Sequence, residues 1–208
     1  MDFEIDTYQK VLTPHDSTTG GGSASAIAGA MAAALLAMVC RLSGPAHTGG
    51  AGAAATPTAP PLDASPLSFE PSAGQAQALS ERLLLGARLD REAFQGVSAA
   101  FKLPREDQTQ RSLRSQAIQA AWLQAARAPL DNAAACLDTL VLAHALQPHI
   151  NPRVASDLSC ALLLARAGVL GCLENVAINL PSIKDPAAAA ALADQAAGLR
   201  LRLDQIPH

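Results

Sequence analysis

A run of three glycines closed by a serine, Gly20-Gly21-Gly22-Ser23, directly precedes the least polar part of the chain, an alanine-rich segment without any charge up to Cys40. Glycine lets a backbone approach a ligand closely, and serine is a preferred N-cap, so we expect a helix to begin at Ser23. The unpaired N–H groups of its first turn suit an anion or a polarised carbonyl. The glycines and Ser23 are therefore predicted to bind a substrate.

A second polar pattern lies in the predicted helix between residues 151 and 180. Residues three or four apart there share one helical face, which carries Asp157, Ala161, Leu164, Gly168, Gly171, Asn175 and Asn179. A glycine inside a helix costs about 1 kcal/mol relative to alanine, which is tolerated where a backbone or a flat ligand comes close. Close helix packing and ligand contact both explain the stripe. For Asn175 and Asn179, capping or interhelical bonding is as good an explanation as a ligand contact.

Asp157 is the candidate catalytic residue of this stripe. It follows Ser156 and shares a face with apolar residues, and a half-buried carboxylate must be paired, hydrogen-bonded or protonated. Two interpretations stay open. Asp157 forms an intrahelical ion pair with Arg153, or it acts in a cleft as an acid, a base or the partner of a cation.

These residues need elements to hold them, and apolar periodicity predicts those elements. We expect a short amphipathic helix or arm at residues 1–12 and a long loop at about 44–72, which is rich in Pro, Gly, Ala and Thr. Asn151-Pro152 and Asp185-Pro186 read as an N-cap followed by proline at the first helical position. Longer helices are predicted at 23–43, 73–101, 107–147 with a kink at Pro129, 151–180 and 185–205.

Composition predicts an all-α fold. Half of the 208 residues are apolar and only 3% are aromatic, which favours closely packed helices with small side chains. We expect residues 1–208 to form a single domain of about five to six helices around a central, buried, alanine-rich helix. The net charge is −3 and the basic residues are scattered, so nucleic acid is not an expected partner.

Other classes of site or location are less well supported. The uncharged run approaches the length of a membrane span, but it has few large apolar residues, so we expect a buried helix and no membrane. His144 and His149 miss the helical spacing of a metal pair, so no metal is predicted. The cysteines form no CxxC pair and no signal peptide precedes them, which predicts reduced thiols and a cytoplasmic protein.

Motifs spread over the chain from about residue 5 onward resemble the formiminotransferase-cyclodeaminase C-terminal family, which includes free-standing methenyltetrahydrofolate cyclohydrolases. The segments that carry the resemblance are Thr13-Pro14, Gly20 to Ala24, Asp90 to Phe94, Phe101 to Pro104, residues 117–121, Pro129-Leu130, Ser156-Asp157, residues 175–180 and Asp185.

The resemblance implies an all-α homodimer with tetrahydrofolate in a cleft near the glycine loop, and no cofactor besides the folate substrate. It implies a cyclohydrolase, which adds water to the methenyl bridge, or a cyclodeaminase, which closes the formimino group and releases ammonia. A carboxylate near the cationic or tetrahedral one-carbon centre would offset its charge, and Asp157 is the candidate. Asn175 and Asn179 would bind the pterin edge, and Asp90 is a further substrate-binding candidate, with a surface position as the alternative.

The chain also departs from the family pattern. Five residues separate Pro14 from the glycines, and no lysine occurs between Lys10 and Lys102, where relatives have a lysine-rich segment. We expect His47, His149 or an arginine to replace those lysines. The alternative is a catalytically drifted or inactive helical dimer that binds a folate-like ligand or serves as an interaction module.

Overall fold

The computed structural model describes residues 3–13, 19–44 and 69–207, and every regular element within these ranges is a helix, as composition predicts. Six α-helices run through the described residues. Most of the predicted loop at 44–72 lies outside the described residues, and its last four residues are already helical. The α-helices are α1 (Phe3–Val11), α2 (Gly21–Ser43), α4 (Phe69–Phe101), α5 (Gln108–Leu146), α6 (Ala155–Asn179) and α7 (Pro186–Asp204).

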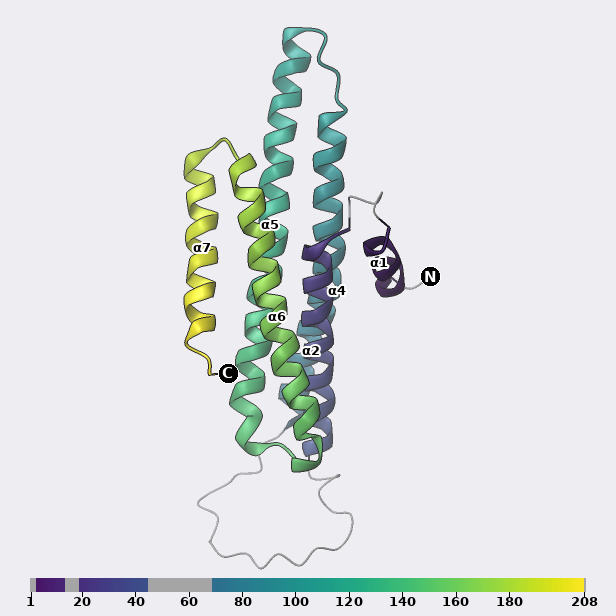
Figure 1. Cartoon of the computed structure of the whole chain (residues 1–208), viewed down its shortest axis with the longest axis vertical. Coiled ribbons are helices and arrows are strands. Elements are labelled where there is room, and N and C mark those ends of the chain that lie inside the picture. The colour runs from purple at the N-terminus through teal and green to yellow at the C-terminus, as the bar shows by residue number, and fades with distance from the viewer. Residues whose placement is uncertain (1–2, 14–18, 45–68, 208) are drawn as a thin grey trace, which may run out of the picture.

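Helix α2 is one of four long helices that form a bundle; it packs along α4 and α6 and contacts α5 less closely (Figure 1). Its side chains Ala26, Ala33 and Leu36 are completely buried. The expected burial of this helix is confirmed for its inner face, but burial on all sides is not, because Met31 and Met38 are 54% and 36% exposed. Helix α2 is therefore a core helix with one stripe left open to solvent.

Small residues set the distance between the central helices. A Cβ atom on Gly168 of α6 would lie 2.8 Å from the Cys136 Sγ of α5 and 3.1 Å from the backbone oxygen of Ser25 in α2. A Cβ on Gly171 would overlap the Ser25 side chain. Close helix packing thus accounts for both glycines of α6, which is the simpler of the two interpretations that the sequence left open.

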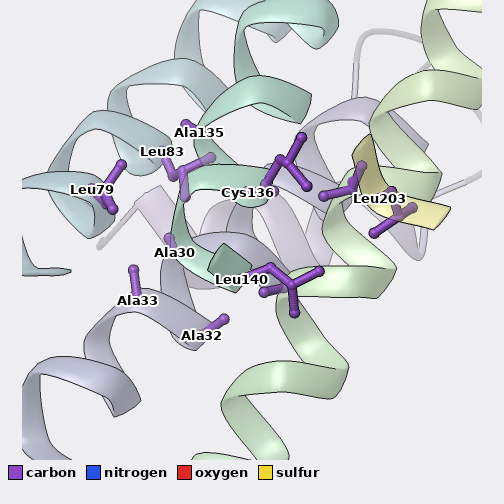
Figure 2. Close-up of a cluster of buried hydrophobic side chains, with 12 residues drawn as sticks. Ala30, Ala32, Ala33, Leu79, Leu83, Ala135, Cys136, Leu140 and Leu203 are labelled. Atoms are coloured by element: carbon purple, nitrogen blue, oxygen red, sulfur yellow. The ribbon is translucent and has the colours of Figure 1, made fainter. Parts of the chain in front are cut away.

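The core beside this crossing consists of alanine and leucine side chains. Figure 2 shows part of it: Leu83 of α4 lies near the alanines of α2, and Leu203 of α7 lies on the other side of Leu140 of α5. Alanine on α2 lets its neighbours approach closely, and leucines on the surrounding helices fill the remaining space. The bundle therefore stays compact although the chain has few aromatic residues.

Helix α5 continues through Pro129, where the sequence predicts a kink and a restart. Proline lacks an N–H group and so leaves the carbonyl four residues earlier without its helical partner. That carbonyl belongs to Ala125, and it accepts a hydrogen bond of 2.8 Å from Asn179 Nδ2 of α6. The bond across helices compensates for the proline.

The predicted start signals of the last two long helices are confirmed. The Asn151 side chain accepts from the Arg153 N–H and caps a short 3₁₀ turn, Pro152–Val154, that leads into α6. Asp185 accepts from the N–H groups of Ala187 and Ala188 at the start of α7.

Candidate active site

The start of α2 is the centre of the candidate site. Helix α2 begins at Gly21, with Gly20 in extended conformation as its N-cap and without a side-chain cap. Ser23 therefore lies in the first turn, and its predicted role as N-cap is wrong. Instead its buried hydroxyl donates a hydrogen bond of 2.9 Å to Asp90 Oδ2 of α4. The start of α2 is thus capped by Asp90, a side chain of another helix, and not by a residue of its own segment.

Asp90 supplies the negative charge at this helix end. Its carboxylate accepts from both the hydroxyl and the backbone N–H of Ser23, whereas the first turn of α2 has no acidic residue of its own. Burial raises the pKa of Asp90 above its ordinary value, although the two bonds from Ser23 oppose that rise. Asp90 is thus a half-buried carboxyl group at a positive helix terminus, and not a surface residue.

The first two helical glycines leave room for polar side chains. A Cβ on Gly22 would lie 2.6 Å from both carboxylate oxygens of Asp90. A Cβ on Gly21 would lie 3.1 Å from Asn175 Nδ2 of α6. A side chain at Gly22 would therefore displace the carboxylate, whereas Gly20 has open space around it.

The two asparagines of α6 have different surroundings. Asn175 faces the first turn of α2, and its Nδ2 donates 2.8 Å to the Gly171 carbonyl of its own helix. Asn179 Nδ2 is engaged by the Ala125 carbonyl described above. Asn175 therefore belongs to the site, while the amide group of Asn179 serves helix packing.

Asp157 lies elsewhere in the chain. It is in the first turn of α6, eighteen residues before Asn175, so it is about 27 Å away along the helix axis. It forms no ion pair with Arg153 and no hydrogen bond with any other residue in the described ranges. Within one chain the predicted convergence of Ser23 and Asp157 does not occur, and a catalytic role of Asp157 stays a prediction.

Two of the cysteines that the sequence predicts to be reduced thiols lie close enough to Asp90 for its charge to act on one of them. Cys136 and Cys172 are buried and hydrogen-bonded to each other, and this bond, burial and the nearby Asp90 charge all raise the pKa of Cys172. Cys136 lies four residues after Asn132 and Cys172 three residues before Asn175. This spacing did not predict that the thiols lie near the site, because two cysteines at these positions also fit an apolar core.

The cation that would replace the family's lysines is not evident. His47 lies outside the described residues, and His149 is exposed in the 3₁₀ turn after α5, near the end of the bundle far from Ser23. Arg91 follows Asp90 but pairs with Asp6 of α1 at 2.7 Å. Over the ranges that the structure describes, no three His, Cys, Asp or Glu side chains are grouped to hold a metal.

Known proteins resemble this chain over most of its length. The family profile described as formiminotransferase-cyclodeaminase matches residues 4–198. A methenyltetrahydrofolate cyclohydrolase of Methylorubrum extorquens is 32% identical over 189 residues, which cover 88% of this chain and 82% of that protein. The crystal structure of a formiminotetrahydrofolate cyclodeaminase from Thermotoga maritima shares the fold with a TM-score of 0.72 at 22% identity, covering 98% of this chain and 90% of that one. The chain belongs to the formiminotransferase-cyclodeaminase family.

Proposed function

We propose that this protein is a methenyltetrahydrofolate cyclohydrolase of one-carbon folate metabolism, working as a cytoplasmic homodimer without a metal or redox cofactor. The observation that carries the proposal is the 32% identity to a cyclohydrolase across most of both chains. The carboxyl group at the start of α2 gives that relationship a chemical basis.

The reaction needs one group that moves a proton near a cationic carbon. The oxygen of a water molecule bonds to the methenyl carbon, and the bond from that carbon to N5 breaks. One water proton ends on N5, and the other is released, which leaves 10-formyltetrahydrofolate. Asp90 takes a proton from the attacking water and delivers one to N5, a task suited to a carboxyl group at the site whose pKa burial raises above its ordinary value.

The neighbouring groups position the substrate. The free N–H groups at the start of α2 face a carbonyl of the pterin or a carboxylate of the glutamate tail. Phe94 lies one turn beyond Asp90 on α4, and its ring meets the edge of Trp122 with centroids 6.4 Å apart. An aromatic pair beside the carboxyl group provides an apolar wall for a flat ring.

Absorbance of methenyltetrahydrofolate tests the proposal directly. Purified protein should accelerate its loss over buffer, and Asp90→Asn should lower kcat at least about a hundredfold, since general acid–base catalysis contributes typically 10²–10⁴. Asn can still accept a bond from Ser23, so the variant separates proton transfer from capping. Ser25→Ala is the matched control, because the Ser25 hydroxyl bonds only to its own helix, at the Gly21 carbonyl.

Three other outcomes would point elsewhere. Release of ammonia from formiminotetrahydrofolate, with no loss of the methenyl compound, identifies a cyclodeaminase. Quenching of Trp122 fluorescence by 5-formyltetrahydrofolate without turnover identifies a ligand-binding relic. Decay equal to buffer and no binding leave an interaction module of the same fold.

A further inference from the structure

Helices α4 and α5 run side by side in opposite directions, and a groove of about 570 Å³ lies between them (Figure 1). Every described residue that lines it belongs to one of these two helices. We call it the α4/α5 groove; its lining includes Leu85, Gly86, Leu89, Glu92, Arg127 and Asn132. Neither Ser23 nor Asp90 is among the lining residues, so the groove is separate from the candidate active site.

The α4/α5 groove contains a buried amide group without a partner. Asn132 is only 4% exposed, and its Nδ2 forms no hydrogen bond with any part of the chain that the structure describes. Gly86 lies directly opposite, and a Cβ there would overlap Asn132 Oδ1, so only glycine leaves room for the amide. Half a turn about the last side-chain bond exchanges the two ends of the amide, so Asn132 can offer the groove a donor or an acceptor. An unpaired buried amide is costly, and a hydrogen bond to a ligand would offset that cost.

Two charged side chains of opposite sign lie on the two edges of the groove. Glu92 is six residues after Gly86 on α4, about 9 Å along the helix, and Arg127 is five residues before Asn132 on α5, about 7.5 Å. Because the helices are antiparallel, both lie on the same side of the Gly86–Asn132 contact and at nearly the same level. Neither forms an ion pair within the described ranges. A ligand with a carboxylate and an ammonium group on neighbouring atoms fits between them.

The charges around Asn132 favour an uncharged group at the other end of the ligand. Asp131 is exposed beside Asn132, and Arg82 lies one helical turn before Gly86; both line the groove. A carboxylate or a phosphate placed there is repelled by Asp131, which disfavours a nucleotide and the glutamate tail of a folate. A primary amide instead donates to Asp131 and accepts from Asn132 or Arg82.

We propose that the α4/α5 groove binds a free α-amino acid whose side chain ends in a primary amide, and that L-glutamine is the one of fitting length. Its carboxylate pairs with Arg127, its ammonium group with Glu92, and its side-chain amide with Asn132. Its methylene groups pack on Leu85 and Leu89, which are 56% and 48% exposed. Asparagine is one methylene shorter and does not span the about 7.5–9 Å between the two polar ends as well. The proposal does not depend on the folate chemistry proposed above.

Nuclear magnetic resonance tests the site through the Asn132 amide itself. In the spectrum of the ¹⁵N-labelled protein, the side-chain amide signals of Asn132 are those that Asn132→Ala removes. They should shift and saturate as L-glutamine is added. Calorimetry should show that Asn132→Ala binds L-glutamine at least about fivefold more weakly, as expected for the loss of one hydrogen bond.

Variants and analogues test the charged end of the ligand separately. Glu92 and Arg127 are exposed, so Glu92→Gln and Arg127→Gln should fold like the wild type in circular dichroism, and each should weaken binding at least about fivefold. Arg105→Gln is the matched control, because Arg105 is equally exposed but lies in the loop between α4 and α5. N-acetyl-L-glutamine, which has no ammonium group, and L-glutamate, which adds a carboxylate, should both bind at least about fivefold more weakly than L-glutamine.

Several results would overturn the proposal. One is the absence of saturable shifts of the Asn132 signals up to about 10 mM L-glutamine. Another is an affinity for L-glutamine that none of the three groove variants changes, which would place the bound amino acid elsewhere. Equal binding of N-acetyl-L-glutamine, or displacement of L-glutamine by 5-formyltetrahydrofolate, would show that the groove does not select a free amino acid. Turnover of methenyltetrahydrofolate enters none of these measurements, so a failure of the cyclohydrolase assignment leaves them unaffected.

Discussion

The hydrogen bond between Ser23 and Asp90 predicts a coupling energy that depends on pH. A hydrogen bond to a charged acceptor contributes about 1.5–3 kcal/mol to stability, and a neutral pair contributes about 0.5–1.5 kcal/mol. The hydroxyl of Ser23 is buried and lies 2.9 Å from the carboxylate. We therefore expect a coupling of about 1.5–3 kcal/mol between Ser23→Ala and Asp90→Ala at pH 8, falling by about half when the carboxyl is protonated.

The assay is urea unfolding of the wild type, both single variants and the double variant at a series of pH values. The hydroxyl also lies 3.3 Å from the Ala87 carbonyl, so it keeps an acceptor when Asp90 is removed. Ser25→Ala serves as the matched control and should show no coupling to Asp90. A coupling below about 0.5 kcal/mol, or one that is the same at all pH values, would refute the assignment of Asp90 as the cap of α2.

Three further predictions concern the same part of the bundle. Gly22→Ala should lower turnover at least about tenfold without unfolding the protein, as measured by kcat and circular dichroism, because its Cβ displaces the Asp90 carboxylate. Gly168→Ala should destabilise the protein by about 1–3 kcal/mol in urea unfolding, because its Cβ would crowd the Cys136 thiol, and Cys136→Ala should partly rescue it. Gly198 has open space around it, so Gly198→Ala should be neutral or stabilise the protein by up to about 1 kcal/mol. The pKa of Asp90 is raised in the folded state, so its contribution to stability falls as the pH rises from the pKa of the unfolded state through the pKa of the folded state. Over that window Asp90→Asn should therefore gain stability relative to the wild type. A difference between the two proteins that stays constant from pH 4 to pH 8 would contradict this.

Local signals in the sequence predicted most of the fold. The capping roles of Asn151 and Asp185 depend on residues two or three positions away, so the sequence contains all the information needed to recognise them. Proline was harder to interpret. Pro71 suggested a loop, yet it lies in the first turn of α4, where its missing N–H costs nothing. Pro129 suggested a kink, yet α5 continues through it. The Asn179 amide that compensates for the proline comes from α6, so the sequence around Pro129 does not reveal it.

The candidate site could be predicted only in part for the same reason. The glycines and Ser23 were visible as a motif, but the partner of Ser23 is 67 residues away, and only the packing of α2 on α4 joins them. Asp90 could therefore be predicted only as a substrate-binding candidate, with a surface position on a long helix as the alternative, and its bond to Ser23 could not be predicted.

Asp157 shows how this limit affects a functional assignment. Its neighbours along α6 suggested a carboxylate in a cleft, and the chain leaves it partly exposed and unpaired at the far end of that helix. A carboxylate that keeps part of its contact with water needs no positive partner, and the start of α2 already has the carboxylate of Asp90 beside it. If Asp157→Asn leaves turnover unchanged while Asp90→Asn lowers kcat at least about a hundredfold, Asp90 is the carboxyl group on which the chemistry depends.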